Sequence, residues 1–282
     1  MTSLRVFAYS IAVAALALAA GGCGGGAGSN GVAELTRNLS AEQDSYAVVD
    51  LAAMREDLGL DEESDPLTAA PSSPLATGAE PALAGLLAGR RAGDANFALG
   101  LDQATAVAAS EGPDGAVSVI QTDADTGEIG SALGDIGYEE RGGVLVRDPG
   151  PSFRLDVGLI YAAASPAPLR NLPEEPLDEL PDPLLDELDA PLVEVDRSNA
   201  GCVLSEGATG EAEGTGEVSL LIDGDAEAER LSAGDVPGVA FGEPDADGDV
   251  VSVDAAPADS ESAFSGFAAV EALNDGDVSY QC

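Results

Sequence analysis

The chain has 282 residues and a formal net charge of −41, because 52 Asp and Glu stand against 11 basic residues, all of them arginine. Such a surface repels phosphates, whose binding requires Lys or Arg, so DNA and RNA are excluded as partners. The chain contains no histidine, which removes Ser-His-Asp and Cys-His catalysis and imidazole metal ligands. The absence of lysine removes Schiff-base chemistry as well.

The first 22 residues have the layout of an export signal. Arg5 precedes the apolar run VFAYSIAVAALALAA, residues 6–20, and small residues follow it. The run is shorter than the roughly 20 residues that a transmembrane helix needs. We therefore interpret residues 1–22 as a signal peptide that is removed on export.

The residues Ala20-Gly21-Gly22-Cys23 resemble the lipobox of bacterial lipoproteins, although Ala20 stands where leucine is commoner. The resemblance implies that the signal is cut before Cys23 and that this cysteine is diacylated. The protein would then be exported and anchored through lipid to the outer face of the cytoplasmic membrane. The alternative is ordinary secretion, with Cys23 in a disulfide. Residues 23–44 are predicted to be the lipidated cysteine and a flexible tether, because 24–31 are rich in glycine.

Residues 45–163 are predicted to form a first α+β half. Residues 45–60 read as a strand running into a helix, followed by a loop over 61–81, a helix over 81–93 and a strand over 96–102. In 115–148 we expect a strand, a helix and a hairpin, because Asp125 and Glu128 have capping-box spacing. A single strand is expected over 153–163.

Residues 164–200 are predicted to be an acidic, proline-rich connector. Ser165 is placed to cap a helix that begins at Pro166. The segment LPEEPLDELPDPLLDELDAPL, residues 172–192, repeats LDEL and reads as an exposed connector of one-turn helices. The alternative is that this charge run is a docking strip for a basic partner.

Residues 201–282 are predicted to form a second α+β half related to the first. Residues 216–254 suggest a strand, a helix and a hairpin across PDADG. A further helix is expected from a stripe of Phe264, Phe267, Val270 and Leu273, and a strand ends the chain. The resulting order, β-α-β-β-α-β, is that of a ferredoxin-like fold.

Cys202 and Cys282 are predicted to form one structural disulfide, since an exported chain favours pairing of its remaining cysteines. The bridge would close a loop of about 80 residues and contribute on the order of 4 kcal/mol through chain entropy. The alternative, a redox pair, would be expected to have CxxC spacing or a basic environment. Neither is present in the sequence.

The sequence contains no set of residues that we would assign to catalysis, and we expect no cofactor. Asp245, Asp247 and Asp249 suggest a calcium loop, but an EF-hand needs Gly and Glu where Val250 and Ala256 stand. We therefore expect a surface lipoprotein with a binding or structural role, toward an unidentified protein or small molecule. The alternative is a two-carboxylate hydrolase acting on envelope glycan or peptide.

Overall fold

The computed structural model describes residues 30–70 apart from 42 and 63, four single positions (72, 73, 75 and 79), residues 103–259 apart from 199, and residues 268–282. The helix predicted over 81–93 and the strand predicted over 96–102 lie outside these residues. Phe264 and Phe267 lie outside them as well.

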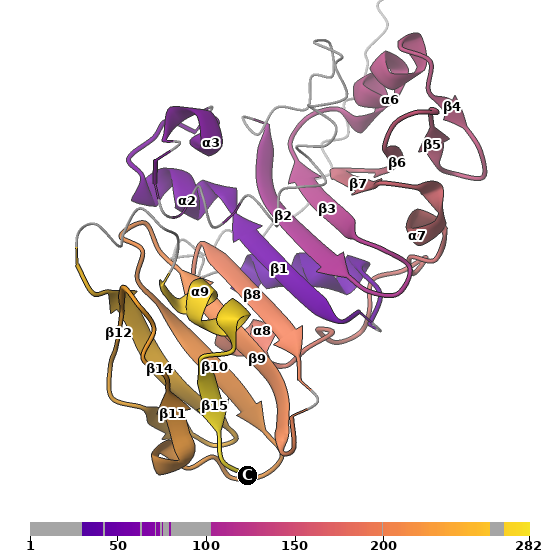
Figure 1. Cartoon of the computed structure of the whole chain (residues 1–282). Coiled ribbons are helices and arrows are strands. Elements are labelled where there is room, and N and C mark those ends of the chain that lie inside the picture. The colour runs from indigo at the N-terminus through magenta and orange to yellow at the C-terminus, as the bar shows by residue number, and fades with distance from the viewer. Residues whose placement is uncertain are drawn as a thin grey trace, which may run out of the picture.

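Within the described residues, thirteen strands form one sheet in the order β12-β14-β10-β9-β8-β1-β2-β3-β7-β6-β5-β4, with β13 also paired to β14 (Figure 1). Every neighbouring pair is antiparallel. The strands are β1 Ser45–Asp50, β2 Ala104–Glu111, β3 Val117–Thr122, β4 Glu139–Glu140, β5 Leu145–Val146, β6 Ser152–Asp156, β7 Leu159–Ala163, β8 Leu192–Arg197, β9 Val203–Gly210, β10 Gly216–Ile222, β12 Val239–Phe241, β13 Asp245–Asp247 and β14 Val250–Pro257. A separate pair consists of β11 Leu231–Ala233 and β15 Val278–Tyr280.

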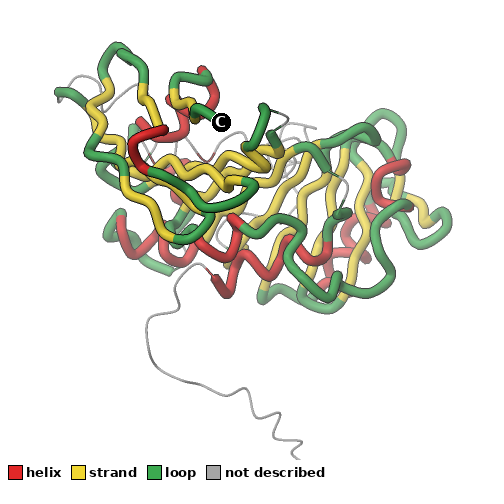
Figure 2. The backbone as a smooth tube through the Cα atoms, turned by 90° about the horizontal axis from the view of Figure 1, so that it is seen from below, coloured by secondary structure: helices red, strands yellow, loops and turns green. Residues whose placement is uncertain are grey.

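Short helices lie on both faces of the sheet (Figure 2). The helices are α1 Asn30–Ala33, α2 Leu51–Asp57, α3 Pro66–Ala69, α6 Thr126–Asp135, α7 Pro166–Arg170, α8 Leu184–Glu187 and α9 Ala268–Asp275, with 3-10 turns η1 Glu34–Asn38 and η2 Ala228–Arg230. Residues of α2, α6 and α9 pack into one apolar core, and residues of α1, η1, α7 and α8 pack into a second. Helices and an antiparallel sheet together make the chain an α+β protein, as predicted.

The first half contains the predicted strand-to-helix unit and the predicted strand, helix and hairpin. It also has two elements that were not predicted, helix α3 inside the expected loop 61–81 and strand β2. Strand β1 runs directly into α2, whose first amides are capped by Asp50, and β3 is followed by α6 and the β4–β5 hairpin. Asp125 Oδ1 accepts hydrogen bonds from the amides of Gly127 and Glu128, at 2.8 and 3.3 Å. The single strand expected over 153–163 is instead two strands, β6 and β7.

The predicted ferredoxin-like order of the second half is wrong. Between β10 and the β13–β14 hairpin the structure has the 3-10 turn η2 and two short strands, β11 and β12, in place of a helix. Pro237 and two glycines with positive φ, Gly224 and Gly238, interrupt this stretch, so an α-helix cannot extend through it. The hairpin across PDADG is present as β13 and β14, and α9 and β15 follow as expected.

The segment interpreted as an exposed connector contributes to the fold. Strand β8 lies between β9 and β1, so the two predicted halves share one sheet. Leu184, Leu185 and Leu188 are buried, because α8 packs them against the sheet. Ser165 precedes α7, but its side chain makes no capping hydrogen bond.

Part of the predicted tether also belongs to the folded body. Residues 30–38 form α1 and η1, and Leu35 and Leu39 are buried in the core that these turns share with α8. A flexible tether therefore cannot extend beyond residue 29. Among the described residues, no helix is both long enough and apolar enough to span a membrane.

Candidate functional site

Two adjoining cavities lie beside α8, on the face of strands β9, β10 and β14 that is opposite α9. Their volumes are about 510 and 360 Å³, and they share Glu187, Leu188 and Glu217 as lining residues. We call these two cavities together the acidic trough. Its lining carboxylates are Glu187, Asp189, Glu211, Glu217, Asp245, Asp247, Asp249 and Asp254, and none of the lining residues that the structure describes is basic.

A buried carboxylate, Asp182, holds α8 beside the strands. Asp182 is 4% exposed, and its Oδ1 accepts hydrogen bonds from the amide of Leu184 at 3.0 Å and from Ser205 Oγ at 3.1 Å. The Arg197 guanidinium lies 3.9 Å from Asp182 Oδ2 and donates to the carbonyl of Pro181 at 2.6 Å. Contacts to β8 and β9 therefore fix the start of the one-turn helix that borders the trough.

Two glycines permit the close approaches around the trough. A Cβ at Gly207 on β9 would lie 2.7 Å from Leu188 Cδ1, so a side chain there would push α8 outward. A Cβ at Gly216 on β10 would overlap the carbonyl oxygen of Thr209 on the neighbouring strand. The absence of side chains at Gly207 and Gly216 therefore allows α8 and the neighbouring strand to lie close to β9 and β10 at the trough.

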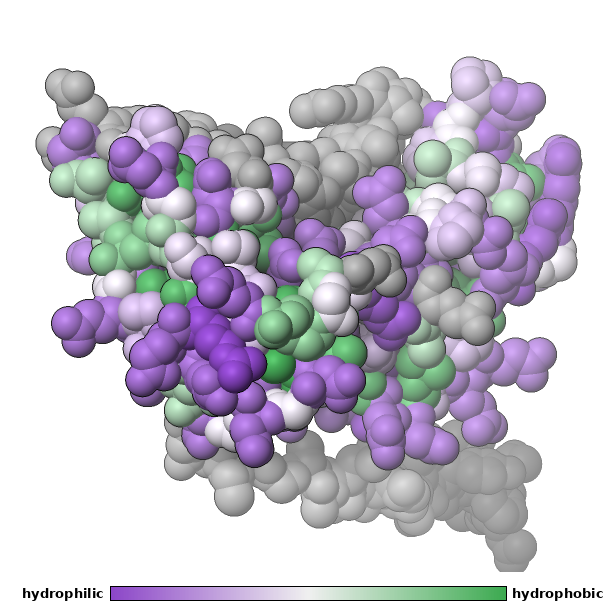
Figure 3. Space-filling model, turned by 60° about the horizontal axis from the view of Figure 1, so that its bottom comes forward, coloured by the Kyte–Doolittle hydropathy of each residue, from purple (hydrophilic) through white to green (hydrophobic). Residues whose placement is uncertain are grey.

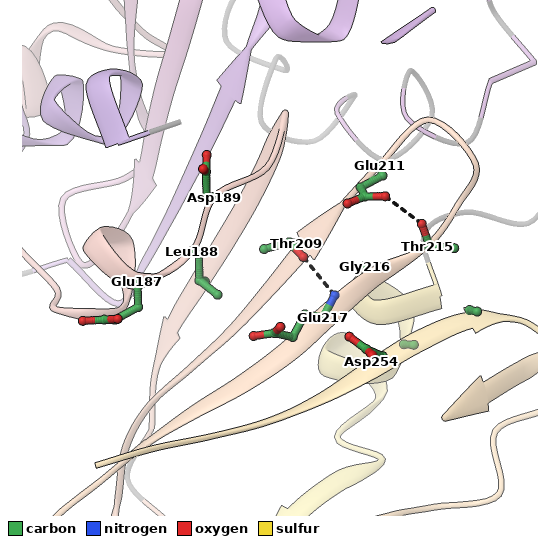
Figure 4. Close-up of a pocket in the computed structure, with 11 residues that line it drawn as sticks. Glu187, Leu188, Asp189, Thr209, Glu211, Thr215, Gly216, Glu217 and Asp254 are labelled. Carbon is green, nitrogen blue, oxygen red and sulfur yellow. Dashed lines mark hydrogen bonds between the residues drawn. The ribbon is translucent and has the colours of Figure 1, made fainter. Parts of the chain in front are cut away.

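The floor of the trough places two carboxylates directly opposite one another. Glu217 on β10 pairs in register with Asp254 on β14, and Figure 4 shows them side by side. Glu217 Oε1 accepts a hydrogen bond from Ser219 Oγ at 2.6 Å, and the Glu217 amide donates to Thr209 Oγ1 at 2.8 Å. Like charges at directly opposed positions destabilise a sheet. This pair therefore costs stability.

The remaining carboxylates surround that pair. Glu187 and Asp189 come from the α8 side, and Glu211 accepts from Thr215 Oγ1 at 3.0 Å in the turn between β9 and β10 (Figure 4). Asp245 pairs with Ser252 at the other end of the floor. No group of three or more Asp, Glu, Cys or His residues in the described part of the chain is placed to hold one metal ion.

A second group of carboxylates lies on the other face, at β8. Burial, and then the neighbouring Asp196, raise the pKa of Glu194 to about 7. Burial also raises the pKa of Asp196, and the charges of Glu206 and Glu111 add to this shift. Asp196 pairs with Glu206 on β9, so these acids lie on adjacent strands. We call Glu111, Glu194, Asp196 and Glu206 the β8 carboxylates.

The structure brings together the predicted cysteine pair. Cys202 and Cys282 form a disulfide with their Cα atoms 5.5 Å apart, and it joins the start of β9 to the end of the chain. Cys23 lies outside the described residues. The face in Figure 3 is mainly hydrophilic, with smaller hydrophobic patches. Of the large hydrophobic side chains described, Val157 and Leu204 are exposed.

Sequence reasoning considered most of the trough residues without assigning them a joint role. Asp245, Asp247 and Asp249 were considered only as a calcium loop, and the structure places the first two in strand β13. Glu187 and Asp189 belong to the acidic segment 172–192 that has the docking-strip alternative. Glu217 and Asp254 were not singled out. The pairing of β10 with β14 brings them together, and strand alternation alone could have placed both on one face.

Comparison with known proteins gives no family assignment. No family model matches the chain, and no curated protein matches it. Among solved structures, "Structure of crystal form I of TP0453" matches with a TM-score of 0.41 at 8% identity, covering 86% of this chain and 96% of that one. "Structure of crystal form III of TP0453" matches with a TM-score of 0.39 at 9% identity, covering 82% and 96%.

Proposed function

We propose that this chain is an exported, lipid-anchored protein with a non-enzymatic binding role, and that the acidic trough binds a cationic ligand. The observation that carries the ligand class is the opposed pair Glu217 and Asp254, in a groove whose described lining residues include no basic side chain. A bound cation would relieve their repulsion, so ligand binding would recover stability that the empty trough lacks. The lipobox-like residues 20–23 support the anchor.

The ligand class is tested by calorimetric titration of the purified protein with spermine and with a tetra-arginine peptide. We expect the variant Glu187→Gln/Glu217→Gln/Asp254→Asn to bind both probes at least about tenfold more weakly than the wild type, a loss of about 1.4 kcal/mol. The matched control is Glu128→Gln/Asp135→Asn/Glu140→Gln, which removes the same charge from exposed positions around α6 and β4. Equal losses in both variants would reduce the effect to net charge and refute the trough as the site.

The anchor is tested separately with Cys23→Ala. Two acyl chains give stable membrane attachment, whereas one gives only reversible binding. We expect the variant to be released from membranes or to accumulate as uncut precursor. A processed Cys23→Ala protein that still fractionates with the membrane would contradict the anchor.

Two-carboxylate hydrolysis is the second candidate, favoured by Glu194. A carboxyl with a pKa of about 7 retains its proton near neutral pH, as a general acid requires, and Asp196 lies two residues away on the same strand. Incubation with labelled envelope glycan and peptide tests this role. Turnover that Glu194→Gln abolishes would establish the hydrolase, whereas saturable probe binding without turnover supports the binding role.

A further inference from the structure

We infer that the open edge of strand β6 binds an extended segment of another polypeptide, which adds to the sheet as a further antiparallel strand. This edge is at the β4–β6 end of the sheet, whereas the acidic trough lies beside β9, β10 and β14 (Figure 1). The two sites are therefore separate, and either can fail its test without the other.

Strand β6 is fully paired on one side only. All five of its residues pair with β7, whereas β5 pairs with it only through Leu145 and Phe153. Strand β5 does not continue past Leu145 on that side, because Gly142 and Gly143 form the turn from β4 and both have positive φ. Among the described residues, no strand therefore lies beside the rest of this edge, residues 154–156.

The polar backbone groups of Leu155 point away from β7, toward this open edge. The Thr122 amide donates to the carbonyl of Gly158 at 3.0 Å, in register with the β3–β7 pairing. Hydrogen-bonded and non-hydrogen-bonded pairs alternate along an antiparallel ladder, so Ile160, two residues further on, also bonds to β3. Leu155 is opposite Ile160, so its amide and carbonyl do not bond to β7 and can pair with an added strand.

A cavity of about 650 Å³ lies at this edge, lined by residues of α6, of the β4–β5 hairpin and of β6. Helix α6 lines it with small residues that include Gly127, Gly130 and Ser131, and the hairpin contributes Gly143. A Cβ at Gly130 would lie 3.1 Å from Leu155 Cδ1, so the glycine allows α6 to pack directly on β6. The small residues leave room for a side chain of a strand placed beside Leu155.

The lining residues indicate which side chains the added strand would carry. Paired residues on adjacent strands point to the same face, so the residue opposite Leu155 would direct its side chain toward α6, near Leu145. An apolar side chain suits that position. Its two neighbours would lie on the face of Arg154 and Asp156, which pair with each other at 2.9 Å, so uncharged polar side chains suit them.

An exposed hydrophobic side chain lies at the end of the same edge. Val157 follows Asp156 in the turn between β6 and β7, and at 98% exposure it is the most exposed of the large hydrophobic side chains described. A partner segment that continues beyond Asp156 would pass this valine and cover it. The edge therefore favours a polypeptide longer than the three residues that can pair with β6.

The first test is an NMR titration of the purified protein with a blocked, uncharged peptide, acetyl-Val-Thr-Thr-Leu-Thr-amide. Its leucine would lie opposite Leu155, and its valine would extend toward Val157. In an antiparallel pair the amide of this leucine donates to the Leu155 carbonyl, whereas the amide of the preceding threonine points away. N-methylation of the leucine should weaken binding at least about tenfold, and N-methylation of that threonine less than about twofold. Equal effects, or no saturable binding of the unmethylated peptide, would overturn strand addition.

Amide hydrogen exchange at saturating peptide tests where the peptide lies. Exchange of the Leu155 amide should slow at least about tenfold, because this amide would donate to the peptide. Exchange of the Arg154 amide should not change, because this amide faces β7. An unchanged Leu155 amide would place the peptide elsewhere and overturn the site.

Two matched substitutions test the cavity. Ser131→Phe fills its α6 side, whereas Ala132→Phe introduces the same side chain at the next exposed position of α6, which does not line the cavity. We expect Ser131→Phe to weaken the peptide at least about tenfold and Ala132→Phe to leave its affinity unchanged. Equal affinities would overturn the site. A wild-type dimer in sedimentation analysis that Ser131→Phe dissociates and Ala132→Phe does not would identify a second copy of the chain as the occupant, and would overturn a different partner.

Discussion

Strands β9, β10 and β14 have two faces that serve different purposes. On one face Val218, Leu220 and Val253 are at most 1% exposed and pack with α9. On the other, the alternate positions Glu217 and Asp254 line the trough. Successive side chains of a strand point to opposite faces, so the same backbone supports a core on one face and the acidic trough on the other. Substitutions on the two faces should therefore have different effects on stability.

The largest effect is expected on the α9 face. Leu220→Ala removes a side chain that is 1% exposed and leaves a cavity, so we expect the free energy of unfolding to fall by about 2–4 kcal/mol. Ser252→Ala, on the trough face of β14, should change it by less than about 0.5 kcal/mol. Urea unfolding measures both variants. Similar losses would show that the two faces do not differ in this way.

The next effect concerns the β8 carboxylates and appears as a pH dependence. The folded-state pKa of Glu194 is about 7, against a reference value of 4.5, so between these values the folded state binds more protons than the unfolded state. The free energy of unfolding therefore falls as pH rises from about 4.5 to about 7, because the stabilisation from protonated Glu194 is lost. The total fall is up to about 3 kcal/mol. The raised pKa of Asp196 acts in the same direction.

Glu194→Gln tests this dependence by urea unfolding at pH 5, 6, 7 and 8. The variant should lose most of the decline in stability between pH 5 and 7 and should exceed the wild type above pH 7. Glu140→Gln, at an exposed position of β4, is the control and should keep the wild-type profile. A Glu194→Gln profile parallel to the wild type would contradict the pKa shift.

Local signals in the sequence predicted local structure well. The unit β3–α6–β4–β5 was found because Asp125 has the spacing of a helix cap, and capping acts within a few residues. The disulfide was found because only two cysteines remain after Cys23. A helix cap and the number of cysteines, both read directly from the sequence, were thus sufficient to predict these features.

The sequence did not predict features that depend on distant partners. The segment 223–238 is acidic and alanine-containing, which suggested a helix, but its short strand β11 pairs with β15 at the end of the chain. Strand β8 was assigned to a connector because prolines and acids precede it, although it pairs with β1 and β9. The trough depends on pairings of the same kind, those of β10 with β9 and β14 and of β13 with β14, so its carboxylates could be recognised individually but not as one surface.

A smaller effect is expected from the glycine beneath α8. In Gly207→Ala the new Cβ must displace Leu188, and we expect the free energy of unfolding to fall by about 1–2 kcal/mol with weaker binding of the tetra-arginine peptide. The control is Gly134→Ala in α6, where nothing lies within 4 Å of the new Cβ. That change should stabilise the protein by about 0.5–1 kcal/mol. Destabilisation by both would show that contact with α8 is not the cause.

The smallest effect concerns the opposed carboxylates on the trough floor. Glu217→Gln/Asp254→Asn removes their repulsion, so we expect the free energy of unfolding to rise by about 0.5 kcal/mol at low salt. Screening shortens electrostatic interactions to about 3 Å at 1 M salt, so the gain should largely disappear there. The exposed pair Glu128→Gln/Asp135→Asn is the charge-matched control and should give a smaller gain. A trough variant less stable than the wild type at low salt would mean that Glu217 and Asp254 stabilise the sheet. There would then be no repulsion between them for a cationic ligand to relieve, which would contradict the argument for the proposed ligand class.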